Sequence, residues 1–306
     1  MIPGDTASIA APIVNAMTID VEDYFQVSAL EPYIGRDDWE RMPRRVEANT
    51  DRILAMLERR GIKATFFVLG WVAERHPALV RRIVAQGHEV ASHGYAHKRI
   101  TQQAPAAFRR DVTRAKSLLE DVSGQAVAGY RAPSYSIGPG TLWALDVLAA
   151  AGYRYSSSIF PIRHDLYGMP NAPRFPFYPQ ARGILEIPVT TVSVAGRKLP
   201  CGGGGWFRLL PYAPFKWALR HVNRGDGQPG VFYFHPWEID PGQPRVTGAK
   251  LKSRFRHYVN LDRMEGKVAR LLDDFRWARM DSVFLDGRRH YPLAALEEPG
   301  AQPLRA

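Results

Sequence analysis

The amino-acid sequence predicts an α/β fold in which parallel strands alternate with helices around one large core. Short runs rich in β-branched and aromatic residues recur along the 306-residue chain, and stretches with apolar residues at helical spacing lie between them. The composition, 45% hydrophobic and 23% charged, is that of a globular protein with a full core. This many strand–helix units favours a barrel.

The elements of the N-terminal half follow from these patterns in order. Residues 14–21 read as a buried strand that leads into an acidic cluster. Residues 44–60 carry apolar side chains on one helical face, and Gly61 ends that helix. We then expect a strand at 62–69, a helix at 71–86 with a break near Pro77, and a strand at 88–92.

The same alternation continues further along the chain. We expect a helix at 105–122, a strand at 127–131, a helix at 141–151, strands at 153–158, 184–189 and 231–235, and a helix at 261–278. Residues 161–179 contain five prolines and several aromatic residues, which indicates a long irregular excursion. Such a segment is either a lid or binding surface or a packed surface loop.

Charge and cysteine content limit the kinds of partner. The net charge of +11 suits anionic partners without choosing among them. The sequence carries no recognisable nucleic-acid-binding module, so we expect no nucleic acid as a partner. Basic residues of the C-terminal part are compatible with peripheral contact with a membrane or a lipid-linked sugar. The single cysteine, Cys201, excludes an intramolecular disulfide framework and a cysteine-ligated zinc site.

The hydropathy pattern bears on location. No apolar run approaches the roughly 20 residues that a membrane-spanning helix needs. The start of the sequence lacks the basic segment of a secretory signal, since the first Lys or Arg is Arg36. We therefore expect a cytoplasmic protein, with the inner face of the membrane as an alternative site.

Polar residues stand at the ends of four predicted strands. The carboxyl ends of parallel barrel strands meet at one face, so we expect these residues to lie together. The first group is Asp20, Glu22 and Asp23, whose mutual repulsion is tolerable where a cation or base chemistry uses them. By itself such a segment also fits a solvated loop.

The other three groups extend the same pattern. His93 and His97 are spaced so that two imidazoles can bind one divalent metal, although packed or exposed histidines share this spacing. Arg131 opens the turn 131–135, where it could orient a carboxylate while backbone amides stabilise an oxyanion. His235 ends an aromatic run and suits a general acid. Together the four groups fit metal-assisted hydrolysis of an amide or ester.

On these motifs the chain resembles the polysaccharide deacetylases, the chitin deacetylase-like carbohydrate esterases. The resemblance implies a partial (β/α)7-type barrel at 14–240, including the excursion 161–179, with a C-terminal extension at 241–306 packed against it. Four segments are similar to a subgroup found in exopolysaccharide and exosortase loci, namely DVEDYF (20–25), GGGGWFRLLPY (202–212), HPWEID (235–240) and RHYVNL (256–261).

The resemblance implies a role for each matching residue. Asp20 would be the catalytic base, Arg131 would hold it, and His235 would be the general acid. Ser134 and Tyr135 are candidates for contact with the oxyanion, and an aromatic residue beside the acid, Trp237, could stack on a sugar ring.

The resemblance also implies one divalent metal, with Zn²⁺ expected and Co²⁺, Ni²⁺ or Fe²⁺ as alternatives. His93 and His97 would bind it together with one carboxylate. That carboxylate is either Glu22 or Asp23, and Asp23 is preferred because the family uses an aspartate.

The sequence departs from the family at two places. Ser134 separates the turn proline from Tyr135, which leaves open which backbone N–H would face an oxyanion. Ser156 stands where the subgroup carries an aspartate, and Glu238 is a candidate for the missing carboxylate.

The predicted function is the removal of N-acetyl groups from amino sugars of an exopolysaccharide or of its lipid-linked precursor. The expected partner is an N-acetylated polysaccharide or oligosaccharide. A catalytically inert carbohydrate-binding protein and a small-molecule amidase of the same fold are the alternatives.

Overall fold

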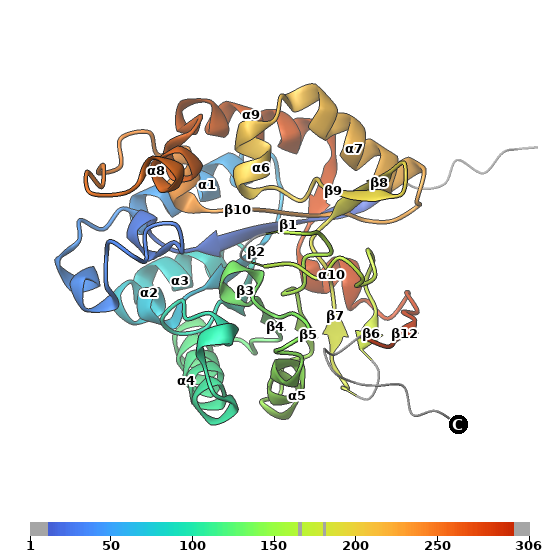
Figure 1. Ribbon diagram of the computed structural model, residues 1–306, viewed down its shortest axis with the longest axis horizontal. Helices are drawn as coiled ribbons and strands as arrows, with labels where there is room; N and C mark the ends of the chain where they lie inside the picture. Colours follow the sequence, from blue (N-terminus) through green and yellow to red (C-terminus); the bar gives the residue numbers. More distant parts are fainter. Residues whose placement is uncertain (1–11, 165–166, 180–181, 297–306) are drawn as a thin grey trace, which may run out of the picture.

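The computed structural model describes residues 12–164, 167–179 and 182–296. At its centre is a curved sheet in the order β10-β1-β2-β3-β4-β5-β7, in which every neighbouring pair is parallel (Figure 1). The strands are β1 (Val14–Val21), β2 (Thr65–Val68), β3 (Glu89–Ser92), β4 (Gly129–Tyr130), β5 (Tyr155–Ser156), β7 (Leu185–Glu186) and β10 (Val231–Phe234). This is the predicted α/β architecture, a partial (β/α)7-type barrel.

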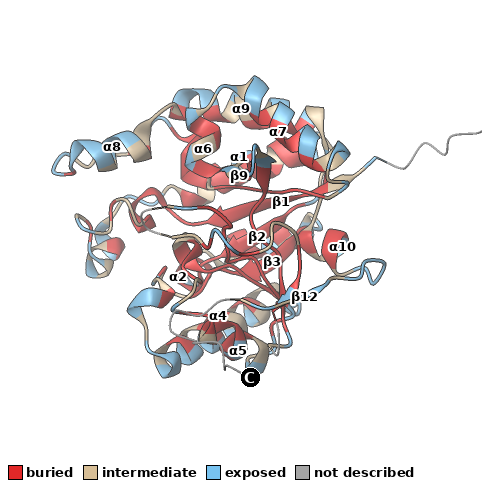
Figure 2. Ribbon diagram, turned by 45° about the vertical axis from the view of Figure 1, so that its right-hand side comes forward, coloured by how far each residue is buried: buried red, intermediate tan, exposed pale blue. Residues whose placement is uncertain are grey.

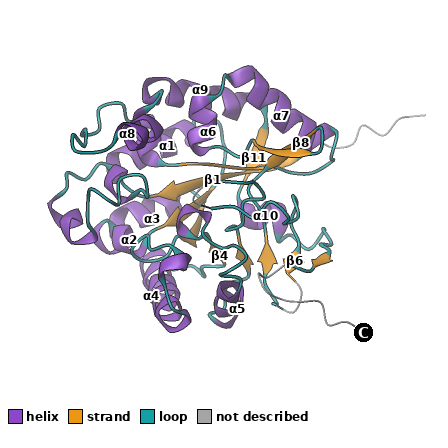
Figure 3. Cartoon of the chain, in the orientation of Figure 1, coloured by secondary structure: helices purple, strands orange, loops and turns teal. Residues whose placement is uncertain are grey.

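Helices surround the sheet (Figure 3). They are α1 (Val46–Glu58), α2 (Gly70–Arg75), α3 (Pro77–Ala85), α4 (Pro105–Ser123), α5 (Trp143–Ala150), α6 (Gly204–Leu209), α7 (Tyr212–Arg224), α8 (Leu251–Tyr258), α9 (Leu261–Asp274) and α10 (Met280–Phe284). The break near Pro77 is confirmed, because α2 ends at Arg75 and Pro77 is the first residue of α3. Gly124 ends α4 in the left-handed conformation, at φ +67°.

The core lies on both faces of the sheet (Figure 2). Seven of the eight residues of β1 are buried, as expected for a central parallel strand covered on both sides. On the outside, α4 buries the stripe Phe108, Val112, Ala115 and Leu119 against this core. The excursion 161–179 is irregular over most of its described residues and ends in β6 (Tyr178–Pro179), which pairs with β12 (Leu293–Ala294).

Two local predictions were wrong or incomplete. The helix expected at 261–278 ends at Asp274, because Phe275 is extended (φ −138°, ψ 164°) and leads into β11 (Arg276–Ala278), which pairs with β1. An antiparallel hairpin, β8 (Thr191–Val194) and β9 (Arg197–Pro200), was not predicted. Its turn residues Ala195 and Gly196 both have positive φ, at +47° and +75°, as the tight twist of a two-residue hairpin requires.

Residues beyond 240 are packed into the same molecule. β11 adds a strand beside the start of β1, and α9 buries an apolar face that consists of Leu261, Met264, Val268, Leu271 and Leu272. The division at residue 240 into a barrel and an extension remains a prediction. Within the described parts of the chain, no helix is both long and apolar enough to cross a membrane.

Candidate active site

The predicted polar groups meet at the carboxyl ends of β1, β3, β4 and β10. They surround one cavity of about 920 Å³. All the predicted site residues line this cavity except Arg131 and Asp23. The barrel therefore brings together groups that lie more than 200 residues apart in sequence, as the parallel arrangement of its strands predicts.

Glu22, His93 and His97 form a compact, buried group with ligand atoms within 4.8 Å of one another. Glu22 directly follows β1 and His93 directly follows β3. His97 occupies the left-handed region, at φ +48°, an uncommon conformation for a residue with a side chain. Two imidazoles and a carboxylate are the ligand types of a catalytic zinc site, and three of them leave a fourth position open.

The surroundings of this group fit a bound cation. Glu22 Oε2 is buried and accepts no hydrogen bond from the described residues. His97 Nε2 lies 2.9 Å from it, but this contact is an ion pair only when the His97 ring is protonated. Nδ1 of His93 lies 2.9 Å from the Arg131 carbonyl oxygen, which fixes Nε2 toward the group. Burial lowers the pKa of His93 to about 4, which favours the neutral ring that a metal needs.

Asp23, which the sequence analysis preferred as the third ligand, lies outside this group. Its Oδ1 accepts the backbone N–H of Tyr24 at 2.9 Å. Its Oδ2 accepts the N–H groups of Arg45 and Val46, at 2.7 and 2.9 Å, at the start of α1. These three hydrogen bonds occupy the carboxylate as a cap, so Glu22 replaces Asp23 as the proposed ligand.

Asp20 and Arg131 form an ion pair with almost no exposure to solvent. Arg131 Nη1 lies 2.6 Å from Asp20 Oδ1, and the exposed fractions of the two side chains are 0% and 2%. The guanidinium also donates to Thr18 Oγ1 and to the backbone carbonyl and hydroxyl of Ser157. Arg131 is therefore held by two side chains of β1 and by Ser157, which directly follows β5, and it holds one oxygen of Asp20 in place.

His235 faces the same cavity from the end of β10. Its Nε2 lies 3.6 Å from Glu22 Oε1 and 3.9 Å from Asp20 Oδ2, while its Nδ1 lies 2.9 Å from Glu238 Oε2. Burial alone would lower the pKa of His235, but the hydrogen bond and charge of Glu238, with the charges of Glu22 and Asp20, raise it to about 9. Glu238 is thus a buried carboxylate partner of His235, and its replacement of the aspartate that the subgroup carries at position 156 remains a prediction.

Two of the three predicted substrate contacts, Ser134 and Tyr135, lie in the turn after β4. Ser134 and Tyr135 both have positive φ, at +54° and +50°, and Ser134 Oγ lies 2.5 Å from Ser28 Oγ. The Tyr135 amide donates to the Ala132 carbonyl, so it is not available to an oxyanion. The Tyr135 hydroxyl, however, is buried beside the cavity and has no hydrogen-bond partner among the described residues.

Trp237 is enclosed by the site residues. Its ring stacks with those of His235 and His257, at centroid distances of 5.2 and 4.4 Å, and its Nε1 donates to Glu22 Oε1 at 3.2 Å. Only 6% of the residue is exposed. These contacts orient His235 and Glu22, and they leave little of the ring for the predicted stacking on a sugar.

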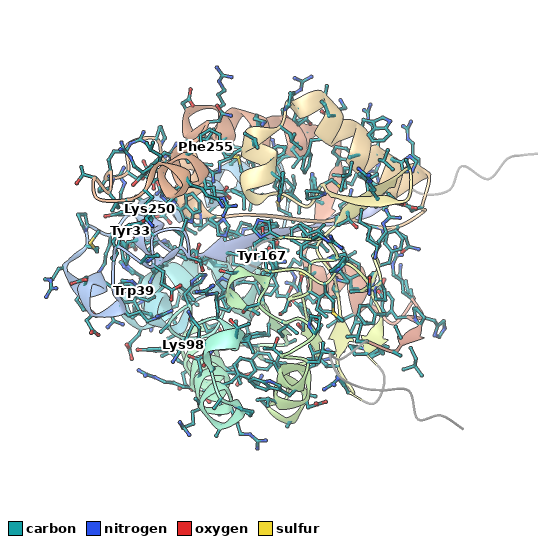
Figure 4. All side chains as sticks on the ribbon, viewed as in Figure 1. Tyr33, Trp39, Lys98, Tyr167, Lys250 and Phe255 are labelled. Atoms are coloured by element: carbon teal, nitrogen blue, oxygen red, sulfur yellow. The ribbon has the colours of Figure 1, made fainter. Side chains whose placement is uncertain are left out.

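Several residues of the cavity were not predicted. Tyr167, from the irregular excursion, and Phe255, from α8, line it and are labelled in Figure 4. Tyr33 and Lys250 join the segment before α8 to the N-terminal part, since the Tyr33 hydroxyl accepts the Lys250 N–H at 3.1 Å. Another missed residue of the cavity is the buried Arg208, whose only sequence signal is its place in the motif GGGGWFRLLPY.

Two family models match consecutive parts of the chain. Residues 37–156 match the polysaccharide deacetylase model, and residues 157–285 match a model described as a domain of unknown function, DUF3473. His93, His97 and Arg131 lie in the first range, and His235 and Glu238 lie in the second. Asp20 and Glu22 precede both ranges.

Curated relatives and a solved structure agree with the first model. Over 102 residues the chain is 34% identical to a chitooligosaccharide deacetylase of Bradyrhizobium sp. (strain ANU 289), which covers 33% of this chain and 44% of that protein. Over 84 residues it is 33% identical to a peptidoglycan-N-acetylglucosamine deacetylase of Bacillus cereus, covering 28% of this chain and 30% of that protein. The chain thus spans less than half the length of either relative.

The likeness in structure extends over most of the chain. A solved structure from Mycobacterium smegmatis, described as a polysaccharide deacetylase, matches with a TM-score of 0.57 and 21% sequence identity. The match covers 90% of this chain and 92% of the other. At this identity the likeness establishes the fold.

Proposed function

We propose that this chain, whose residues 37–156 match the polysaccharide deacetylase model, is a metal-dependent hydrolase that removes N-acetyl groups from amino sugars. The observation that carries the proposal is the meeting of three units in one cavity. They are the Glu22–His93–His97 group, the Asp20–Arg131 ion pair and the His235–Glu238 pair. A cation site, a carboxylate base and an imidazole acid are the groups that amide hydrolysis requires.

Glu22, His93 and His97 would hold one divalent cation, with Zn²⁺ preferred for this ligand set. When bound, such a cation supplies Lewis-acid polarisation of a carbonyl oxygen. The chain's own part is to present two neutral imidazoles and a carboxylate in a buried group. Trp237 and the Arg131 carbonyl orient two of these ligands through hydrogen bonds.

Asp20 would act as the base. Arg131 holds its Oδ1, which leaves Oδ2 directed toward His235 and the cavity. In the proposed reaction Oδ2 takes a proton from water while the water oxygen forms a bond to the acetyl carbon. The Tyr135 hydroxyl, buried without a partner, is a donor suited to the oxyanion that develops.

His235 would act as the acid. Glu238 accepts a hydrogen bond from Nδ1, so Nε2 carries the proton that faces the cavity when the ring is charged. As the carbon–nitrogen bond breaks, Nε2 donates this proton to the leaving nitrogen. The products are acetate and a free amino sugar.

For the natural substrate we propose an exopolysaccharide or its lipid-linked precursor. The cavity is roomy, and the aromatic residues Tyr167, Trp206 and Phe255 along it suit stacking on sugar rings. Residues 241–261 carry five basic side chains and no acidic one, and part of this segment lines the cavity. Such a segment suits an anionic carrier or membrane surface nearby.

The test is acetate release from N-acetylglucosamine oligomers by enzyme stripped of metal and then reloaded with zinc, cobalt or nickel. We expect release that metal restores and that His93→Ala abolishes together with metal binding. His221→Ala, at an exposed position on α7, is the matched histidine control and keeps both. Metal bound without release would point to another acyl substrate, including a small-molecule amide. Failure to bind any metal would favour an inert carbohydrate-binding protein.

A further inference from the structure

Arg208 is a buried cation outside the groups considered so far. It lies on α6, and its side chain is 2% exposed. Its Nε donates to Glu238 Oε1 at 2.6 Å, and the exposed fraction of the Glu238 side chain is 0%. Burying an ion pair to this extent costs desolvation free energy, whereas hydrophobic residues at the same positions would not have this cost. The presence of the pair therefore calls for a specific reason.

Glu238 connects this arginine to the proposed acid. Its Oε1 accepts from Arg208, while its Oε2 accepts both the backbone N–H of His235 at 3.0 Å and the ring Nδ1 at 2.9 Å. The carboxylate therefore has one oxygen for each partner. Without Arg208, Oε1 would be an unpaired buried charge, and the carboxylate would rotate or take up a proton.

The rest of the Arg208 guanidinium holds one wall of the cavity. Its Nη atoms donate to the backbone carbonyls of Arg256, His257 and Val259, at 2.9, 2.7 and 3.1 Å. These residues lie at the end of α8, and Arg256 and Val259 line the cavity. Only a planar group with several donors can serve a carboxylate and three carbonyls together, which distinguishes arginine from lysine here.

We propose that Arg208 is a positioning residue for His235. Acting through Glu238, it fixes the ring orientation and tautomer of the imidazole, and it joins this acid to the wall of the cavity formed by α8. The proposal rests on the proposed function of His235 as the proton donor to a leaving amine. It also gives a role to part of the DUF3473 range, which contains Arg208, Glu238 and α8.

The first test compares two leaving groups in Arg208→Met. An amino sugar leaves only if it is protonated, whereas 4-nitrophenolate leaves without a proton. We expect kcat on N-acetylglucosamine oligomers to fall about 100-fold with KM changed less than about threefold, and hydrolysis of 4-nitrophenyl acetate to change less than about threefold. An equal loss on both substrates would mark a merely structural role, and no loss on either would also overturn the proposal.

The control is the neighbouring ion pair between Arg45 and Asp240, which flanks the same turn, η5 (Pro236–Ile239). Arg45→Met removes an arginine partner from that turn without touching Glu238, and we expect it to leave both rates unchanged. If Arg208→Met does not fold, Arg208→Gly with added guanidinium replaces it. Restoration of oligomer hydrolysis by guanidinium supports the proposal, and its absence in a folded protein overturns it.

A readout independent of turnover separates this proposal from the proposed function. The Nδ1 proton of His235, held against Glu238, should give a resolved downfield NMR signal in the metal-loaded protein. We expect Arg208→Met and Glu238→Gln to lose this signal while the metal content stays unchanged. A signal that persists in Arg208→Met contradicts the positioning role. A wild-type protein that shows the signal but hydrolyses no N-acetylated sugar contradicts only the proposed function.

Discussion

Three carboxylates, Asp20, Glu22 and Asp23, lie at the end of β1, and their side chains do not all face the cavity. Side chains alternate along an extended chain, so Asp20 and Glu22, two residues apart, point to the same side, and Asp23 points to the other. Asp20 and Glu22 face the cavity, while Asp23 caps α1. This alternation was present in the sequence and would have favoured Glu22 over Asp23. The preference for an aspartate as ligand obscured it.

The two roles predict opposite results for two conservative variants. Glu22→Gln removes a charged ligand and should lower zinc affinity at least about 100-fold, since even indirect partners of a metal contribute 10- to 100-fold. Asp23→Asn should keep zinc affinity within a few-fold but lower the free energy of unfolding by about 1–2 kcal/mol, because the cap is weakened. Titration calorimetry and urea unfolding measure the two quantities. A loss of zinc in Asp23→Asn alone would reverse the assignment.

His88 predicts a pH dependence of stability away from the cavity. The buried Nδ1 accepts the Ala64 N–H at 3.1 Å, and burial lowers the pKa of His88 to about 4 from its usual 6.5. Between these values the unfolded chain binds more protons, so the contribution of His88 to stability is present above pH 6.5 and is lost as the pH falls toward 4.

The comparison is with His88→Asn, which keeps a polar side chain that does not titrate. The difference in unfolding free energy between the wild type and this variant should shrink by up to about 3 kcal/mol from pH 7 to pH 4. A difference that stays constant over this range would exclude the neutral, buried ring.

Among the elements, the glycine-rich segment before α6 has a packing role. Gly203 has φ +120°, and a Cβ there would lie 2.0 Å from the Tyr233 carbonyl oxygen. Gly202 accepts the Tyr233 N–H at 2.7 Å, so the segment runs along the outer edge of β10. This close backbone approach positions Arg208 one turn later on α6.

Substitution of Gly203 should therefore be costly. Gly203→Ala combines a disfavoured φ with a backbone clash, and we expect the unfolding free energy to fall by more than about 3 kcal/mol. Gly266→Ala, in α9 with no atom within 4 Å of the added methyl, should raise it by about 0.5–1 kcal/mol. Thermal unfolding of both variants measures this contrast, and equal effects would contradict it.

Sequence patterns identified elements where periodicity and breakers agreed. The strand at 14–21 has the predicted bounds, and the Pro77 break is where it was expected. The predictions from sequence patterns were wrong where pairing between distant parts of the chain decides the secondary structure. Residues 276–278 continue the helical spacing of α9, yet they pair with β1 because that edge would otherwise lack partners. The contacts of Arg208 could not be predicted from the sequence, since its partners lie at 238 and 256–259.

At the scale of the molecule, no single segment contains the candidate site. The proposed ligands and base come from the first 131 residues, and the proposed acid, Glu238 and Arg208 come from residues 208–238. Residues beyond 240 then pair with β1 and hold one wall of the cavity. A protein that ends after Asp240 should therefore lose cooperative unfolding, because β1 loses β11 and the apolar face of α9 is missing. A cooperative transition equal to that of the full chain would establish 14–240 as an independent domain.

The central position of β1 has a consequence for synthesis on the ribosome. β1 is translated before every other strand of the sheet, yet its partner β10 begins 210 residues after β1 ends, from Val21 to Val231. At roughly 5–20 residues per second, that interval lasts roughly 10–40 s. Throughout it β1 can pair only with β2, and its other edge stays open to pairing with a neighbouring nascent chain. Translation speed should therefore affect the yield of this protein more than that of a fold whose first strand finds its partners at once.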